Sequence, residues 1–200
     1  MKKRRKPSKR LSKGWQNLVF GLLLVNLIFS FCSLHKAKVA FSPYAQTPRH
    51  LFVSRVSHAA QTVAQRHDLY PSVMLAQAIL ESNNGQSQLS QKPYYNFFGI
   101  KGNYKGHSVI LPTLEDDGQG NLYQIDDAFR SYGNLSACFE DYARLLSDPL
   151  YQNTHKKKAD TYQEVTTNLT GTYATDTAYA AKLNQVIETY QLYYFDYPIK

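Results

Sequence analysis

Cysteine is scarce in this chain, and its scarcity excludes two kinds of protein. The 200 residues include two cysteines, two methionines and one tryptophan. Cys32 lies in an apolar segment and Cys138 in a predicted helix, so we expect no disulfide between them. Two cysteines are also too few for a zinc site built on cysteine. A disulfide-stapled secreted scaffold and a cysteine metal centre are therefore excluded.

Several motifs that mark a known chemistry are also missing. The six histidines form no HExxH pair, and the chain contains no GxSxG, GxGxxG or P-loop. The acidic run from Glu115 to Asp117 fits a calcium loop poorly, because Gln124 stands where a bidentate glutamate is required. We therefore expect no metal and no cofactor, and no signature points to a nucleophilic serine or cysteine.

Acidic residues are absent from the first 14 positions, which hold eight lysines and arginines. The rest of the chain carries 15 basic and 15 acidic residues, so the net charge of +8 belongs to the N-terminal tail. A neutral domain lacks the basic surface that binds a phosphate backbone. Nucleic acid is therefore not an expected partner.

An uncharged apolar segment follows the basic tail. Residues 15–34 include the run LVFGLLLVNLIFSFCSL and are long enough to cross a bilayer. The basic residues before this segment predict a cytoplasmic N-terminus and an external C-terminus. A cleaved signal peptide is the alternative, although Lys38 is unfavourable for cleavage after Ala40; a buried core helix is a third reading. We expect a basic tail at 1–14, a transmembrane anchor at 15–34, a linker at 35–49 and a folded domain at 50–197.

Apolar spacing in this domain predicts helices interrupted by one small β element. Residues 102–132 differ from their surroundings, because β-formers at 109–111 precede a turn-rich segment at 116–121 and a second β-rich stretch. We therefore expect an α+β fold, mainly helical, with a β-hairpin or a three-stranded sheet. The helical patterns cover residues 52–63, 72–82, 135–146, 162–169 and 179–190.

Glu81 is the residue whose position most favours catalysis. It follows Met74 by seven residues and Ala78 by three, so it lies on the apolar side of its predicted helix and in the last turn. Apolar neighbours and a helix C-terminus both raise the pKa of a carboxyl group. A protonated carboxylic acid is what cleavage of a glycosidic bond needs. A glutamate that reaches solvent or pairs with a lysine is the alternative reading.

The predicted hairpin offers a second carboxylate, and the chain is rich in tyrosine. Glu115 could face Glu81 across a cleft, although a solvated acidic turn explains the acidic run as well. Among the 16 tyrosines, Tyr95 and Tyr132 flank the elements of the candidate cleft. Their rings could stack on sugars, or they could serve as half-buried packing residues.

Five motifs occur in one order along the predicted domain. They are LAQAILESNNGQS, NFFGIKG, PTLEDDG, AFRSYGN with FEDYARLL, and GTYATDTAYAAKLNQVIETY. Together they resemble the N-acetylglucosaminidase domain of glycoside hydrolase family 73, found in bacterial autolysins and flagellar peptidoglycan hydrolases. The resemblance covers roughly residues 50–195. It implies a lysozyme-like fold and hydrolysis of peptidoglycan at the N-acetylglucosamine side of the disaccharide.

The resemblance also implies roles for individual residues. Glu81 matches the catalytic acid, Glu115 the carboxylate of a T-x-E motif, and Tyr173 the tyrosine of a Y-A-T-D motif. One departure is Asn84, which stands where many members carry an aromatic residue, and it should alter a wall of the cleft. The residues expected to bind substrate are Tyr95, Asn96, Phe98 and Tyr132.

The function expected from the sequence is therefore that of an endo-β-N-acetylglucosaminidase acting as a monomer outside the cell membrane. Secretion after signal cleavage is the alternative location. A muramidase or a lytic transglycosylase would act on the same glycan strands, and a membrane-anchored wall-binding protein would not act at all. Retention of both Glu81 and Glu115 argues against a decayed site.

Overall fold

A computed structural model describes residues 48–116 and 122–198, which belong to one compact unit, Pro48–Lys200. The expected segments 1–14 and 15–34 and most of the expected linker lie outside the described residues. Within the described part of the chain, no helix is long and apolar enough to span a membrane.

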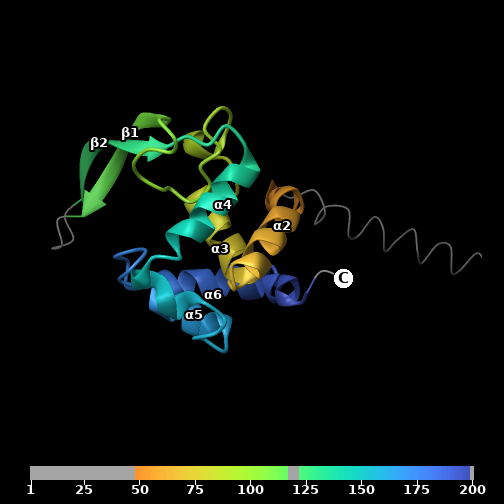
Figure 1. The fold of residues 1–200 in the computed structure, drawn as a ribbon. Helices are drawn as coiled ribbons and strands as arrows, with labels where there is room; N and C mark the ends of the chain where they lie inside the picture. The colour runs from red at the N-terminus through yellow and green to blue at the C-terminus, as the bar shows by residue number, and fades with distance from the viewer. Residues whose placement is uncertain (1–47, 117–121, 199–200) are drawn as a thin grey trace, which may run out of the picture. The chain divides into compact units, whose positions relative to one another are not determined.

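The observed elements follow the predicted order of helices with one β insertion (Figure 1). Each predicted helix is present within a few residues of its expected bounds. The α-helices are α2 (Pro48–Arg66), α3 (Pro71–Glu81), α4 (Leu135–Leu145), α5 (Tyr162–Leu169) and α6 (Tyr179–Thr189). Residues 48–116 and 122–198 also form three short 3₁₀ helices that the sequence pattern did not indicate, η1 (Gln88–Ser90), η2 (Pro149–Thr154) and η3 (Leu192–Asp196).

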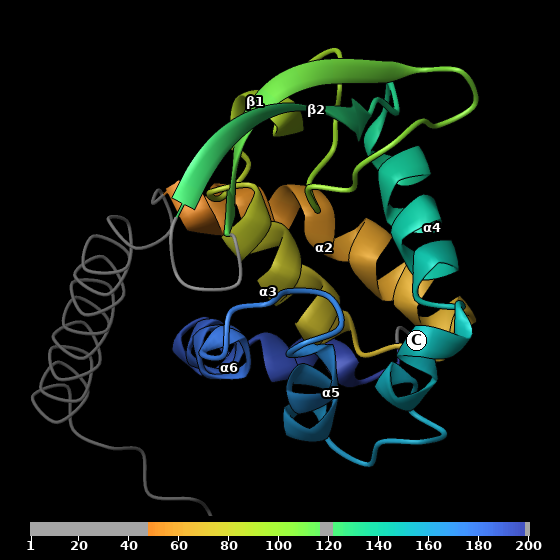
Figure 2. The same ribbon diagram turned by 90° about the vertical axis from the view of Figure 1, so that its left-hand side faces the viewer.

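Helix α3 occupies the centre of the core. Its residues from Pro71 to Ile79 are all buried, and it packs against α2, α6 and η3. Pro71 sits at the first helical position, where the missing N–H costs nothing. In both views α3 lies between the hairpin on one side and α5 and α6 on the other (Figures 1 and 2).

The end of α3 is a tight reversal of the backbone. Asn83, Asn84 and Gly85 take positive φ angles of 49°, 58° and 72°, and asparagine and glycine are the residues that tolerate this region best. A Cβ at position 85 would lie 2.6 Å from the ring of Phe52, so only glycine fits. The reversal leaves Glu81 as the last helical residue.

The β element is a two-stranded antiparallel sheet, so the hairpin expectation is correct and the three-stranded one is not. Strand β1 (Ser108–Asp116) pairs with β2 (Leu122–Arg130). The base of the hairpin is fixed to α4, because Asp141 accepts hydrogen bonds from Arg130 at 2.6 Å and from the Tyr132 hydroxyl at 2.8 Å. The other end of the hairpin projects away from the helices (Figure 1).

Candidate active site

Glu81 is the last residue of α3, and the residue as a whole is exposed. The Tyr179 hydroxyl, at the start of α6, donates a hydrogen bond to Glu81 Oε1 at 2.7 Å. The other carboxyl oxygen faces the loop that contains Gly99, since a Cβ at that glycine would lie 4.0 Å from Glu81 Oε2. The carboxyl group is thus walled by protein on two sides while part of the residue stays open to solvent.

A chain of hydrogen bonds behind Glu81 fixes the direction of the Tyr179 proton. Tyr142 donates to Gln77 Oε1, and Gln77 Nε2 donates to the Tyr179 hydroxyl oxygen at 3.0 Å. Because that oxygen already accepts from Gln77, its proton is directed toward Glu81. Gln77, Tyr142 and Tyr179 are all buried, and hydrogen bonds in series polarise one another in such surroundings.

The electrostatics of Glu81 suit a general acid. Burial of the carboxyl among its neighbours raises its pKa above the usual 4.5, and the hydrogen bond from Tyr179 opposes this rise in part. The pKa of Tyr179 is itself raised, chiefly by burial and then by the charge of Glu81. Tyr179 therefore stays protonated and acts as a permanent donor, while Glu81 retains its proton to a higher pH than an ordinary glutamate.

Asn96 organises the loop that passes beside Glu81. Its amide nitrogen donates to the carbonyls of Ile100 and Arg130, and its oxygen accepts from the amides of Phe98 and Ile100. Asn96 is 1% exposed and Phe98 is 2% exposed, with the Phe98 ring stacked on Tyr142. Both side chains therefore support the fold of this loop, and little of their surface is accessible to a sugar.

Tyr173 contacts two of the groups that surround the Glu81 carboxyl. Its ring stacks on Tyr179 with 6.2 Å between centroids, and its hydroxyl donates to the Phe98 carbonyl at 2.8 Å. Burial raises its pKa, so this proton stays in place. The half-buried Tyr173 thus joins the loop to α6, and its oxygen can accept a further hydrogen bond but has no second proton to donate.

Tyr95 and Tyr132 lie at the base of the hairpin. Tyr132 is buried, donates to Asp141, and packs against Tyr104 with 4.8 Å between ring centroids. Its backbone amide bonds the carbonyl of Tyr94. Tyr95 is half-buried and takes a positive φ of 53°. Of these two candidates, Tyr95 has the more accessible ring.

Glu115 occupies β1 opposite Tyr123, one pair from the end of the sheet that is distal to α4. Its carboxyl group lies outside what the structure describes. Glu81, Tyr173, Asn96 and Phe98 are therefore assembled around one loop, whereas the position of the second carboxylate stays a prediction. No group of three histidines, cysteines or acids within the described residues could hold a metal ion.

Two residues of the site were missed by the sequence reasoning. Tyr179 was counted only as part of an apolar helical pattern, yet it makes the hydrogen bond to Glu81. Gln77 precedes Glu81 by four residues and so shares its helical face. A single amide side chain within the buried stretch VMLAQAIL is a signal that could have revealed it, because buried amides require partners.

The same α+β architecture occurs in solved glycoside hydrolases of the lysozyme-like class. The catalytic domain of the autolysin Auto from Listeria monocytogenes is 39% identical with a TM-score of 0.71, over 81% of this chain and 96% of that one. A peptidoglycan hydrolase mutant from Sphingomonas sp. A1 has a TM-score of 0.64 at 32% identity, over 72% of this chain and 96% of that one.

The chain belongs to the glucosaminidase family. The family model, described as mannosyl-glycoprotein endo-beta-N-acetylglucosaminidase, matches residues 57–192. A probable N-acetylmuramidase of Lactococcus lactis is 45% identical over 73% of this chain and 35% of that protein. The exo-glucosaminidase LytG of Bacillus subtilis is 38% identical over 73% of this chain and 53% of LytG. The chain thus spans between about a third and a half of these two relatives.

Proposed function

We propose that this chain is a peptidoglycan hydrolase, an endo-β-N-acetylglucosaminidase in which Glu81 is the general acid. The observation that carries the proposal is the environment of Glu81. Its pKa is raised by burial, one oxygen is held by Tyr179, and the residue remains exposed at the end of α3. A positioned acid that keeps its proton is the group that glycosidic cleavage requires at the leaving oxygen.

The groups around Glu81 have separate roles in the remaining steps of the reaction. As Glu81 gives its proton to the leaving oxygen, the hydrogen bond from Tyr179 stabilises the carboxylate that forms. The sugar left behind is oxocarbenium-like and needs negative charge beneath it. Glu115 or the substrate's own 2-acetamido oxygen supplies that charge in this proposal, and Tyr173 accepts a hydrogen bond from the acetamido N–H. Tyr95 offers the accessible ring for a sugar contact.

The relatives differ in the bond that their names specify. LytG is named an exo-glucosaminidase, whereas the Lactococcus protein is named a probable N-acetylmuramidase. Family membership favours cleavage after N-acetylglucosamine, and the name of the Lactococcus relative favours the muramidase as the second candidate. The two differ in the sugar that carries the new reducing end.

The test is digestion of purified cell wall by the full chain, followed by borohydride reduction and identification of the reduced sugar. The proposal expects reduced N-acetylglucosamine on fragments of several disaccharides. Reduced N-acetylmuramic acid would establish the muramidase, anhydro-sugar ends a transglycosylase, and single released sugars an exo-enzyme. If the chain binds cell wall but releases no more product than a Glu81→Gln control, only the non-catalytic alternative remains.

We further propose that residues 15–34 anchor the protein in the cell membrane with the catalytic domain outside. The apolar run and the basic tail before it support this arrangement. An anchor would hold a glycosidase beside newly made wall.

A further inference from the structure

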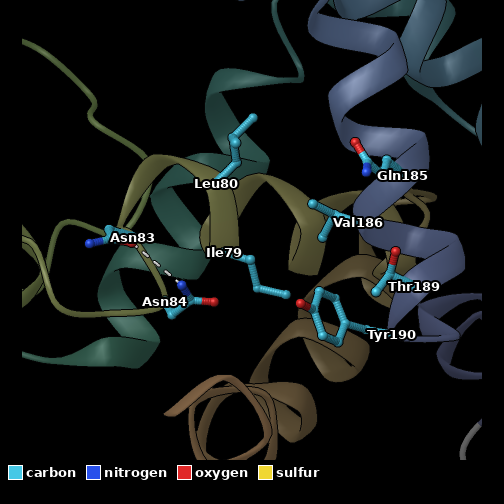
Figure 3. A pocket seen from close by; sticks show the side chains of 8 residues that line it. All are labelled: Ile79, Leu80, Asn83, Asn84, Gln185, Val186, Thr189 and Tyr190. Atoms are coloured by element: carbon cyan, nitrogen blue, oxygen red, sulfur yellow. Dashed lines mark hydrogen bonds between the residues drawn. The ribbon is translucent and has the colours of Figure 1, made fainter. Parts of the chain in front are cut away.

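A pocket lies between the end of α3 and the C-terminal half of α6, and none of the residues assigned to catalysis lines it. Its volume is about 330 Å³. Figure 3 shows side chains from both helices directed into the same space. Its lining includes Ile79, Asn83, Asn84, Gln185, Val186 and Thr189.

The lining of this pocket combines polar and apolar side chains and carries no charged one. Asn83, Asn84 and Gln185 each present a carboxamide, which both donates and accepts hydrogen bonds. Ile79, Val186 and the ring of Tyr190 supply an apolar wall (Figure 3). An uncharged set of donors and acceptors beside aliphatic carbon suits a neutral ligand that combines an amide with a methyl group. It offers nothing to balance the charge of a phosphate or a carboxylate.

The side-chain oxygen of Asn84 lacks a hydrogen-bond partner. Its Oδ1 atom is buried and makes no hydrogen bond, while its Nδ2 makes one long bond of 3.5 Å to Asn83 Oδ1. Buried acceptors without a donor are uncommon in folded proteins. Turning the side chain toward the pocket would sacrifice only the long bond and would let Oδ1 accept from the N–H of a ligand.

The pocket is built on the two helices that also hold the catalytic hydrogen bond. Glu81 ends α3 directly after Leu80 of the pocket and two residues before Asn83, and Tyr179 begins the helix that carries Gln185. Val186 of the pocket follows Tyr179 by seven residues, which places it on the same helical face about 10 Å further along α6. A polymer whose scissile bond is at Glu81 can therefore reach the pocket with a neighbouring unit.

We propose that this pocket is a subsite for a neutral, methyl-bearing secondary amide of the wall polymer. Two parts of peptidoglycan share that chemistry, namely the acetamido group of a sugar and an alanyl unit of a stem peptide. The inference rests on the proposed function for the identity of the polymer. It goes further in assigning a recognition element to residues that have no part in bond cleavage.

The test uses a paired substitution, Gln185→Ala with Thr189→Ala, because both side chains are exposed and make no contribution to the core. Gln163→Ala, an exposed amide on α5, is the matched control. The subsite predicts that KM for cell wall rises about tenfold, the equivalent of one or two lost hydrogen bonds. Turnover at saturation and melting temperature should match those of the control. An unchanged KM would overturn the subsite.

Direct binding separates the two sources of the amide. The full-length Glu81→Gln chain in detergent is titrated with tetra-N-acetylchitotetraose and, separately, with an alanine-containing stem peptide, while side-chain amide signals of Asn83, Asn84 and Gln185 are followed by NMR. Chemical-shift changes on addition of the sugar would identify the acetamido group as the ligand. Changes on addition of the peptide would identify the stem peptide. If neither probe moves these signals while the unmodified chain digests wall, the subsite is refuted and the proposed function stands. If the unmodified chain cuts no wall, the proposed function is the one that fails.

Discussion

Glu81 combines exposure with a raised pKa, and this combination makes a direct prediction for Glu81→Gln. Glutamine keeps the shape and can still accept from Tyr179, but it has no proton to give. We expect turnover on cell wall to fall by at least about 100-fold, the lower end of what a positioned general acid contributes. A Glu188→Gln variant is the matched control, because that exposed carboxyl bonds Tyr162 far along α6. Activity like wild type in Glu81→Gln would remove this residue from the mechanism.

The same variant should not lose stability. The pKa of Glu81 in the folded protein lies above the usual 4.5, so the carboxyl stabilises the fold while protonated. That contribution is lost as pH rises through the folded value, because the desolvated charge is then unfavourable. Near neutral pH, thermal melting of Glu81→Gln should therefore be at or above the wild-type temperature. A clear decrease would mean that the glutamate is structural.

Tyr179 should set the alkaline limit of activity. Its hydrogen bond favours the charged form of Glu81 and lowers that pKa. Removing the hydroxyl in Tyr179→Phe should let the pKa of Glu81 rise further, so that the acid remains protonated at higher pH. The pH–rate profile should show a lower maximum, with its alkaline limb moved to higher pH. An alkaline limb that stays in place would show that the tyrosine does not tune Glu81.

The proposed general acid could be selected from the sequence, whereas the contacts around it could not. Glu81 could be selected because helical spacing and a helix end are local properties. The partnership with Tyr179 joins residues 98 positions apart, and no periodicity encodes such a contact. The same reason explains Asn96 and Phe98, whose motif indicated importance but could not distinguish a sugar contact from a buried support. The structure gives both a place in the core.

At the scale of elements, the turn after α3 controls where the catalytic acid sits. Gly85 has a φ of 72°, and a Cβ there would come within 2.6 Å of the Phe52 ring. Gly85→Ala should therefore destabilise the fold by roughly 1–3 kcal/mol and reduce activity as the end of α3 shifts. Gly133→Ala is a useful control, because its φ is also 72° but nothing lies within 4 Å of the added carbon. Equal losses of melting temperature in the two variants would assign the effect to backbone strain alone.

The elements themselves were largely predictable, for reasons that differ between helices and hairpin. Helices α2, α4, α5 and α6 each bury one face, so their apolar spacing is strong, and α5 and α6 begin where the pattern begins. Helix α3 is buried from Pro71 to Ile79, and its apolar run with Pro71 at the first turn marked it instead. The β-formers that flank a turn-rich segment indicated a hairpin, but they did not determine whether the sheet has two strands or three. The 3₁₀ helices were missed because three to six residues are too few to show a period.

At the scale of the whole molecule, the membrane anchor makes a prediction about location. If residues 15–34 remain attached, the protein should sediment with the membrane fraction and resist extraction by high salt, while added protease digests the domain from outside the cell. N-terminal sequencing is the decisive measurement. A mature protein that begins near Phe41 would establish a cleaved signal and a secreted enzyme.

In the proposed mechanism, the step after protonation of the leaving oxygen involves residues from two parts of the molecule. The helical part supplies Glu81 and Tyr173, and the hairpin carries Glu115 near its distal end, opposite Tyr123. The Tyr173 hydroxyl already donates to the Phe98 carbonyl, so it is free only to accept, and an acetamido N–H is a suitable donor. This arrangement favours attack by the substrate's own acetamido oxygen over direct attack by water activated by Glu115.

The anomer formed first distinguishes these two routes. Attack by the acetamido oxygen inverts the anomeric carbon once and water inverts it again, so the product retains its configuration, and a thiazoline analogue of the intermediate should inhibit strongly. Direct attack by water inverts the configuration, and the analogue should then bind no better than the sugar. We expect retention, read by proton NMR within the first minutes of digestion, together with a loss of activity in Tyr173→Phe. An inverted product would exclude the assisted route, and full activity in Tyr173→Phe would remove the tyrosine hydroxyl from both routes.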